Sequence, residues 1–376
     1  MIYFHIPFCK QACHYCDFHF STSLKYKEDV LLALHKELAT RTMYLEDKKV
    51  HSIYFGGGTP SILEPSEIQH LIDQVAHYFD IDPQAEITLE ANPDDLTREK
   101  VNALRQTAIN RFSIGIQSFF QEDLSWMNRA HNAQEADASI KRVQDAGFEN
   151  ITCDLIYGYP LLSNEKWKAN MDKLTTLNVP HISSYAMTVE HRTVLAHHIK
   201  TGRTPAILED QAELQMRMLM ETLTSHGYEH YEISNFAKNG KYAKHNTNYW
   251  RGKHYLGIGP SAHSYNGISR SWNVANNAKY IAALQEHTEY QEVEQLSLQD
   301  RYNEYIMTSL RTMWGVQTKQ LQEQFGSDFL SHFLREIEPF ITEQKITLDH
   351  DGAYKLTSQG KLFADFIASE LFFIEH

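Results

Sequence analysis

Three of the chain's four cysteines stand within eight residues, in a stretch that reads CKQACHYC. Cys9, Cys13 and Cys16 form the spacing C-x3-C-x2-C, and the chain has no second cysteine pair. A closed zinc site needs four ligands, so zinc would require a nitrogen from a nearby histidine. Soft thiolates also suit a 4Fe-4S cluster, in which three cysteines would leave one iron without a protein ligand. The spacing therefore predicts a metal centre with an open position.

This cysteine pattern, with the aromatic Tyr15 directly before the last cysteine, resembles the signature of the radical S-adenosylmethionine (SAM) superfamily. The resemblance implies that Cys9, Cys13 and Cys16 hold a 4Fe-4S cluster whose open iron is chelated by the amino and carboxylate groups of SAM. It also implies that one electron from the cluster cleaves SAM to a 5′-deoxyadenosyl radical. Tyr15 would lie beside the adenine, and plain packing is its alternative role.

A glycine-rich loop, GGGTPS, follows the second predicted strand from Gly56 to Ser61. Read alone, the loop indicates only a tight turn between a strand and a helix. Glycines lack a Cβ atom, so backbone groups there can approach a ligand closely. By resemblance to the superfamily, Gly57, Gly58 and Thr59 would contact the amino group and the carboxylate of SAM.

Polar residues also stand at the ends of later predicted strands. Glu90 in ITLEANPDD would be costly to bury without a partner, which predicts a ribose hydroxyl, an ammonium or a structural salt bridge beside it. Gln117 follows the fourth strand, Asp154 lies in the fifth, and Arg129 in NRAH is suited to holding a carboxylate bidentately. Cys153 is interpreted as a small buried hydrophobe and not as a fourth cluster ligand.

These residues also resemble a set found in one subfamily, the proteins related to oxygen-independent coproporphyrinogen III oxidase. By that resemblance the SAM region would be lined by Glu90, Gln117, Arg129 and Asp154, together with Tyr3 and Ala186. A purely structural role is the alternative for each of them.

The elements that would position these residues alternate between strands and amphipathic helices. Strands are predicted at Met1–Ile6, Ser52–Phe55, Glu86–Glu90, Phe112–Ile116, Ile151–Ile156 and His181–Ala186. Helices are predicted at Tyr26–Met43, Pro65–Tyr78, Thr97–Gln106, Ala133–Ala146 and Glu165–Leu174. Such alternation predicts an α/β fold with parallel strands, here a partial (β/α)6 barrel of the radical SAM type over residues 1–190. The candidate site residues fall at the carboxyl ends of its strands, where barrel chemistry belongs.

Two further units are predicted after the barrel. Residues 191–295 begin with a loop and a helix around Ile207–Thr224, and form an extension of the barrel. Residues 296–376 read as helices, one of them around Phe329–Ile341, followed by a short hairpin and a closing helix, which resembles an α+β winged-helix module. Because few basic residues cluster there, packing or partner docking is favoured over DNA binding.

Composition sets the class of protein. The chain has 376 residues, of which 42% are hydrophobic, and a formal net charge of −13. It contains no apolar run near the ~20 residues that a membrane span needs, and its clustered cysteines do not form a disulfide framework. We expect a globular, cytoplasmic protein. Its acidity disfavours nucleic acid as a partner.

Within the subfamily, two groups differ at one position near the cysteines and in the segment before the barrel. The oxidases extend the signature to C-x3-C-x2-C-x-C and carry an arm before the barrel, whereas here Phe18 stands at the fourth cysteine position and the chain starts directly at the first predicted strand. Both departures resemble the HemW-type haem chaperones. That group also carries an H-N-x-x-Y-W segment, present here as HNTNYW from His245 to Trp250.

The HNTNYW segment suits haem, because a neutral imidazole can ligate the iron and aromatic neighbours can pack on the macrocycle. We predict that His245 contacts the haem or is its axial ligand, with His254 and His263 in reserve. The alternative is that HNTNYW is a folded turn. Three cationic side chains flank the segment and suit the haem carboxylates: Lys244, Arg251 and Lys253.

The function implied by this resemblance is a radical SAM iron-sulfur protein that binds haem and hands it to an acceptor apoprotein. An electron donor protein is a further expected partner, and an acceptor lying in a membrane would be contacted peripherally. One alternative is oxidative decarboxylation of coproporphyrinogen III, which converts propionates to vinyls. Another is a structural adaptor that carries zinc or a cluster without SAM chemistry.

Overall fold

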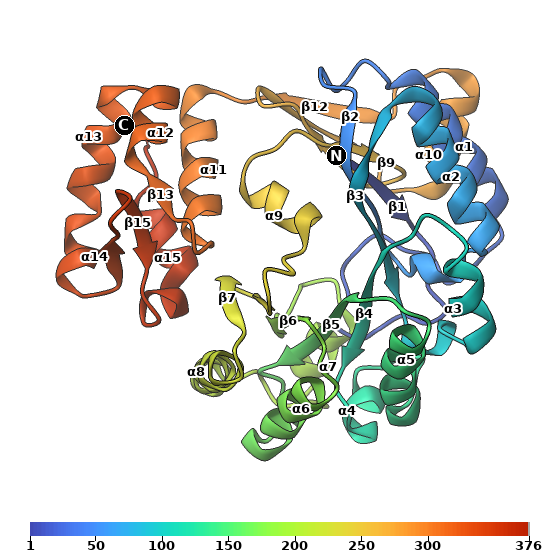
Figure 1. Cartoon of the computed structure of the whole chain (residues 1–376), viewed down its shortest axis with the longest axis horizontal. Helices are drawn as coiled ribbons and strands as arrows, with labels where there is room; N and C mark the ends of the chain where they lie inside the picture. Colours follow the sequence, from blue (N-terminus) through green and yellow to red (C-terminus); the bar gives the residue numbers. More distant parts are fainter. Residues whose placement is uncertain (375–376) are drawn as a thin grey trace.

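A sheet of nine strands, in the order β7-β8-β6-β5-β4-β3-β2-β1-β9, forms the centre of the computed structural model, which describes residues 1–374. The strands β1 to β6 are neighbours in sequence order and pair in parallel. They are β1 (Ile2–Ile6), β2 (Lys49–Gly57), β3 (Asp80–Ala91), β4 (Arg111–Gln117), β5 (Asn150–Tyr157) and β6 (His181–Ala186). The predicted partial barrel of six parallel strands is therefore confirmed (Figure 1).

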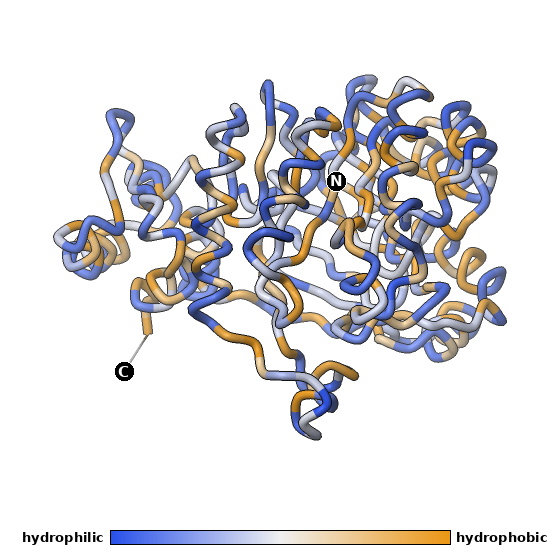
Figure 2. The backbone as a smooth tube through the Cα atoms, turned by 90° about the horizontal axis from the view of Figure 1, so that it is seen from below, coloured by the Kyte–Doolittle hydropathy of each residue, from blue (hydrophilic) through white to orange (hydrophobic). Residues whose placement is uncertain are grey.

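Helices cover the outside of this barrel (Figure 1). They are α1 (Lys27–Thr40), α2 (Pro65–Tyr78), α3 (Arg98–Leu104), α4 (Gln121–Trp126), α5 (Ala133–Asp145) and α6 (Asn164–Thr176). Helix α2 shows why they form: it buries Ile68, Leu71, Ile72 and Val75, which share one face of a helix, against the sheet. The same alternation of apolar and polar residues colours the outer helices in Figure 2. The sequence missed α4, because six residues are too few to show a helical period.

Residues 191–295 complete both edges of the sheet. On one edge β9 (Leu256–Ile258) pairs in parallel with β1, and on the other β7 (Glu229–Glu232) and β8 (Asn235–Ala237) add to β6. The remaining elements are α7 (Val194–Lys200), α8 (Glu209–Ser225), α9 (Lys244–Trp250), β10 (His263–Tyr265), β11 (Ser269–Asn273), α10 (Asn277–Glu286) and β12 (Gln291–Gln295). The loop predicted after Glu190 instead contains α7, whose first turn is capped by Thr193.

The carboxyl-terminal unit has a hydrophobic core of its own. It consists of α11 (Leu298–Leu310), β13 (Val316–Gln317), α12 (Thr318–Phe325), α13 (Ser327–Glu336), α14 (Glu338–Thr342), β14 (Ile346–Leu348), β15 (Ala353–Leu356) and α15 (Ala364–Glu370). Its strands form an antiparallel sheet, as expected for a winged-helix-like module. The single helix predicted over Phe329–Ile341 is two helices, because Pro339 cannot continue the hydrogen-bond ladder. Among the described helices, none is both long enough and apolar enough for a membrane span.

A buried carboxylate fastens the extension to the barrel. Glu37 of α1 is fully buried and accepts hydrogen bonds from the Tyr280 hydroxyl at 2.5 Å, the Asn273 amide at 2.8 Å and the Gly259 backbone N–H at 2.8 Å. Arg41, one turn further along α1, lies 3.4 Å from the same carboxylate. One side chain thus ties α1 to three separate segments that follow β9.

Replacing Glu37 with alanine is expected to destabilise the protein by roughly 3–5 kcal/mol, because Arg41 and the buried donors would lose their partner. Urea unfolding followed by circular dichroism measures the change. Glu28→Ala is the matched control: Glu28 lies in the same helix but is exposed, and its loss is expected to change stability by less than about 0.5 kcal/mol. Equal effects of the two substitutions would contradict the role given to Glu37.

Candidate functional site

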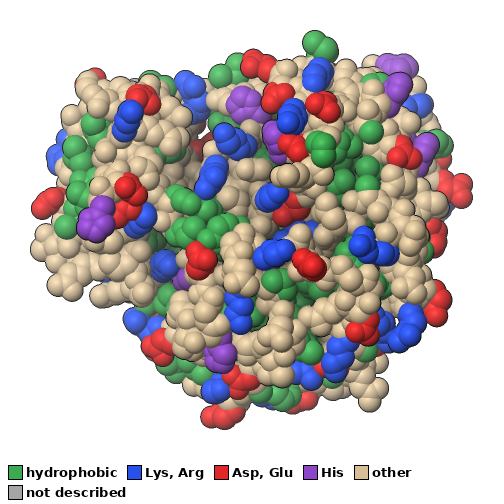
Figure 3. Space-filling view, in the orientation of Figure 1, with side chains coloured by type: hydrophobic (Ala, Val, Ile, Leu, Met, Phe, Trp, Pro, Cys, Tyr) green, Lys and Arg blue, Asp and Glu red, His purple; other side chains and the backbone are tan. Residues whose placement is uncertain are grey.

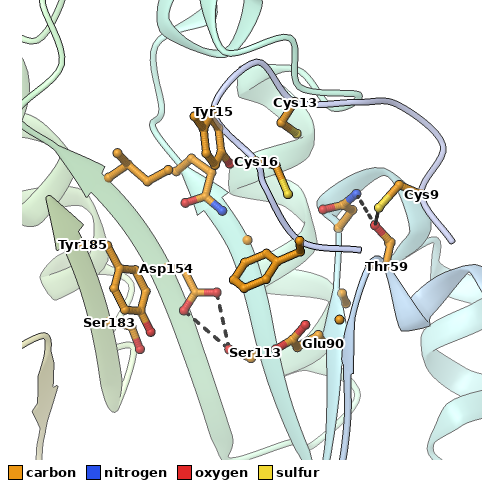
Figure 4. Close-up of a pocket in the computed structure, with 18 of the residues that line it drawn as sticks. Cys9, Cys13, Tyr15, Cys16, Thr59, Glu90, Ser113, Asp154, Ser183 and Tyr185 are labelled. Carbon is orange, nitrogen blue, oxygen red and sulfur yellow. Dashed lines mark hydrogen bonds between the residues drawn. The ribbon is translucent and has the colours of Figure 1, made fainter. Parts of the chain in front are cut away.

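A cavity of about 480 Å³ opens at the carboxyl ends of the barrel strands. Twelve of the fourteen residues that the sequence singled out line it, and they come from the loops and ends of six different strands. They are Cys9, Cys13, Tyr15, Cys16, Gly57, Gly58, Thr59, Glu90, Gln117, Arg129, Asp154 and Ala186. In Figure 4 the cysteine loop passes over the strands that carry Glu90 and Asp154.

The loop that carries the cysteines joins β1 to α1, and backbone hydrogen bonds hold it in place. The Cys9 N–H donates to the Ser21 carbonyl at 3.0 Å, so the loop closes on its own base. Farther along, the His14 N–H donates to the Met127 carbonyl at 3.1 Å. Because both its base and its tip are anchored, the three thiols stay on one side of the cavity although the loop has no regular structure.

Two side chains donate hydrogen bonds to the thiols. The Thr59 hydroxyl lies 3.4 Å from Cys9 Sγ, and Arg129 Nη1 lies 3.3 Å from Cys13 Sγ. Burial raises the pKa of Cys9, and it raises the pKa of Cys16 to about 12. Cys9 and Cys16 are therefore protonated at neutral pH. Thiols that bind a metal become thiolates, and donors are already aimed at Cys9 and Cys13.

The arrangement of the thiols fits a cluster better than a single ion. Among residues 1–374, no three His, Cys, Asp or Glu side chains converge closely enough to hold one metal ion. The three thiols instead line one side of the same cavity, and in a 4Fe-4S cluster each thiolate binds a different iron. Cys153 is fully buried in β5 and does not line the cavity, which agrees with its interpretation as a core residue.

The glycines of the GGGTPS loop are required by the packing of the chain itself. Gly57 has a φ of 103°, and a Cβ atom there would lie 2.6 Å from the His5 ring. A Cβ atom on Gly58 would lie 2.6 Å from the Phe8 carbonyl oxygen. The tight turn therefore explains these two glycines without a ligand, although both also line the cavity.

Arg129 joins the cysteine loop to the ends of two strands. Its Nη1 also contacts the Tyr15 hydroxyl at 3.3 Å, while Nη2 donates to Asn92 Oδ1 at 2.6 Å and to the Gly115 carbonyl at 3.0 Å. The predicted carboxylate partner is thus replaced, in this structure, by neutral acceptors and a thiol. Its Nε is buried without a hydrogen-bond partner among the described residues.

Two half-buried carboxyls face the cavity below the cysteine loop. Glu90 accepts a hydrogen bond from the Tyr54 hydroxyl at 2.7 Å, and Asp154 accepts one from Ser113 at 3.4 Å (Figure 4). Burial raises the pKa of Glu90 to about 7. Burial and the charge of Glu90 raise the pKa of Asp154 to about 7. A cationic ligand would lower both pKa values and so bind more tightly once the carboxyls ionise.

Two predicted residues lie elsewhere. Tyr3, expected near SAM, instead lines a neighbouring cavity, where its hydroxyl lies 3.2 Å from His5 Nδ1. His245, expected to bind haem, is buried and lines neither cavity. Its Nδ1 lies 2.8 Å from the Ser52 hydroxyl and its Nε2 lies 2.9 Å from the Tyr249 hydroxyl. Because both ring nitrogens are engaged inside the protein, this arrangement does not support His245 as a haem ligand.

Several cavity residues escaped the sequence prediction. Tyr54, Ser113 and Ser183 come from the interior face of β2, β4 and β6. The available signal was the presence of polar side chains at alternate positions of strands whose other residues are apolar. That signal becomes readable only when the strand register is known.

An incomplete parallel barrel with three thiols over its mouth defines a class, that of the radical SAM proteins. Residues 3–174 match the radical SAM superfamily, and residues 296–363 match the HemN C-terminal domain. The protein named heme chaperone HemW from Bacillus subtilis is 31% identical over 96% of each chain. The one from Lactococcus lactis is 33% identical over 95% of this chain and 93% of its own. The chain therefore belongs to the radical SAM superfamily and, within it, to the HemW family.

A solved structure supports the fold. Coproporphyrinogen III oxidase (HemN) from Escherichia coli has a TM-score of 0.84 to this chain, with 22% identity, over 99% of this chain and 89% of its own. At that identity the likeness shows the fold alone. Membership of the superfamily implies a 4Fe-4S cluster and SAM, which the cavity at the barrel mouth fits.

The raised pKa of Glu90 predicts a loss of stability as pH rises. Below about pH 4 the Glu90 carboxyl is neutral in both the folded and the unfolded protein. Between pH 4.5 and 7 the carboxyl ionises in the unfolded protein but stays protonated in the folded one. The free energy of unfolding therefore falls by about 3 kcal/mol by pH 8. In the metal-free protein, Glu90→Gln is expected to reduce this fall, as measured by urea unfolding at pH 5 and pH 8. Glu46→Gln, an exposed control, is expected to leave it unchanged.

The cysteine loop predicts a sharp difference between two cysteine substitutions. After anaerobic reconstitution, Cys13→Ala is expected to lose most cluster iron and sulfide, because a cubane with two protein ligands is poorly held. Cys153→Ala is expected to retain both, since Cys153 is buried in β5. Iron, sulfide and zinc analysis with the visible spectrum provides the measurement. Equal iron content in the two variants, or zinc in place of iron, would contradict the assignment.

Proposed function

We propose that this protein is a cytoplasmic haem chaperone, which binds haem and delivers it to acceptor apoproteins. The observation that carries the proposal is similarity over almost the whole chain to relatives named heme chaperone HemW. Haem, an acceptor apoprotein and an electron donor protein are its proposed partners, and an acceptor in a membrane would be contacted peripherally.

One residue supports this choice within the superfamily. Phe18 occupies the position at which the oxidase group is expected to carry a fourth cysteine, and its side chain is 68% exposed. It lines both the cavity at the barrel mouth and the neighbouring one. Because Phe18 has no thiol, this chain lacks the group on which a reaction dependent on that fourth cysteine would rely.

The site at the barrel mouth would hold the cofactors as follows. We propose that Cys9, Cys13 and Cys16 bind the cluster, with Tyr15, Thr59, Glu90, Gln117 and Asp154 around SAM. When bound, a reduced cluster supplies an electron that can cleave SAM. The protein's own contribution is to hold the thiols over the strand ends and to offer two half-buried carboxyls, Glu90 and Asp154, to a cationic ligand.

The second candidate is oxidative decarboxylation of coproporphyrinogen III. It is favoured by the match of residues 296–363 to the HemN C-terminal domain and by the shared fold. Both features also fit a chaperone, and the likeness to the solved oxidase is one of fold alone.

Two assays on the anaerobically reconstituted protein separate the candidates. Titration with haem is expected to give a saturable Soret band at one haem per chain. Incubation with coproporphyrinogen III, SAM and dithionite is expected to give no vinyl product by chromatography. Formation of protoporphyrinogen would overturn the chaperone assignment, and failure to bind haem would also overturn it.

A further inference from the structure

A second cavity, of about 1370 Å³, lies between the barrel and the carboxyl-terminal unit. Ligand pockets usually span ~300–1,000 Å³, so this one exceeds the need of a nucleoside or an amino acid. Its lining comes from β1, α9, β10 and α11, and α9 stands between the two units in Figure 1. Basic side chains gather along the boundary between these units on the face shown in Figure 3. None of the chemistry at the barrel mouth accounts for a space of this size.

Strand register explains one wall of this cavity. Tyr3 of β1 pairs with Gly257 of β9, and Tyr255 pairs with Tyr265 of β10. Paired residues share a face of the sheet, so these tyrosines point the same way, into the cavity. Large rings dominate the lining, among them Tyr249, Trp250, Tyr255, Tyr265, Tyr305 and Trp314. Such a wall suits a large, flat, apolar ligand.

The lining of the cavity includes three acidic residues, Asp17, Glu90 and Glu304, but it is less acidic than the whole chain, whose formal net charge is −13. Four cationic side chains line it, and Arg270 among them forms an ion pair with Glu304. Arg251, Lys253 and Arg301 have no carboxylate within ion-pair distance in the described part of the chain. Arg301 Nε is also buried without a hydrogen-bond partner there. Cations without carboxylate partners beside an aromatic wall suit an anionic ligand, and the Arg251 guanidinium already lies over the Trp314 ring at 4.1 Å.

The histidines of the cavity differ in what their ring nitrogens do. Both nitrogens of His5 are engaged, by the Tyr3 hydroxyl and the His19 carbonyl, and His19 Nε2 contacts Asn277 at 2.8 Å. Within residues 1–374, the rings of His254 and His263 have no hydrogen bond. The His254 ring is turned toward Gly267, where a Cβ atom would lie 2.6 Å from Nε2.

His263 is better placed to ligate a metal in the cavity. It is held on β10, opposite Trp272 of β11, and its ring stacks on the Trp272 ring at 6.1 Å. Partial burial and nearby Arg270 lower the pKa of His263, so the imidazole is neutral and keeps a free lone pair at neutral pH. A ring fixed on a strand loses little freedom when it binds.

We propose that this second cavity is the haem seat, with the macrocycle against the aromatic wall, its two carboxylates near Arg251, Lys253 and Arg301, and His263 as the axial ligand of the iron. The inference rests on the proposed function, because it locates the haem that such a chaperone carries. It replaces His245, whose ring nitrogens are engaged by Ser52 and Tyr249.

The test compares His263→Ala with the matched control His254→Ala, which removes another unbonded histidine from the same cavity. Haem titrations of the reconstituted proteins are expected to show affinity weakened about tenfold or more in His263→Ala, with loss of the parent Soret position, and parent-like binding in His254→Ala. His263→Tyr is expected to bind haem with the charge-transfer band of a phenolate ligand, a change that a merely structural residue would not produce. Unchanged iron and sulfide content shows that each variant is folded.

The carboxylates of the ligand are tested with haem dimethyl ester, in which they are blocked. The parent protein is expected to prefer haem over the ester, and Arg301→Gln to lose most of that preference. If the parent binds haem but His263→Ala and His263→Tyr retain its affinity and spectrum, the inference is overturned while the proposed function stands. If the parent does not bind haem at all, the proposed function itself fails.

Discussion

The anchoring of one irregular loop over the mouth of a parallel barrel is the constraint on which the rest of this structure depends. The segment between β1 and α1 has few regular hydrogen bonds of its own, and it is held instead by bonds to Ser21, Met127 and the guanidinium of Arg129. Arg129 in turn is held by Asn92 and a strand carbonyl. The thiols are therefore positioned by residues distant in sequence, which makes their geometry a product of the whole barrel.

The cavity at the barrel mouth and the cavity beside the carboxyl-terminal unit differ in chemistry as well as size. The smaller one combines thiols with half-buried carboxyls and suits a compact cation, whereas the larger one combines aromatic rings with four cationic side chains. Their different chemistries follow from different origins in the fold: the first from loops at the strand ends, the second from α9, β10 and the carboxyl-terminal unit. A chain with two such sites can hold two unlike ligands at once.

The sequence was sufficient for the barrel because its strands are short apolar runs separated by helical periods, and because the cysteine spacing is local. The sequence did not predict the short strands of residues 191–295. Strands such as β8 and β9 have three residues each, too few to show a period, and their pairing depends on distant partners. The role predicted for His245 shows a related limit: the motif gives the residue type, but only the fold shows that Ser52 lies beside its ring.

The smaller and larger cavities share part of their lining: Asp17, Phe18, Gly57 and Glu90 belong to both. A ligand in one cavity that shifts the side chain of Asp17, Phe18 or Glu90 therefore changes the shape of the other cavity. This coupling is reciprocal. If binding of the first ligand changes the affinity for the second by some factor, binding of the second ligand changes the affinity for the first by the same factor. Because of these shared residues, binding in either cavity is measurable through its effect on the affinity of the other cavity for its own ligand.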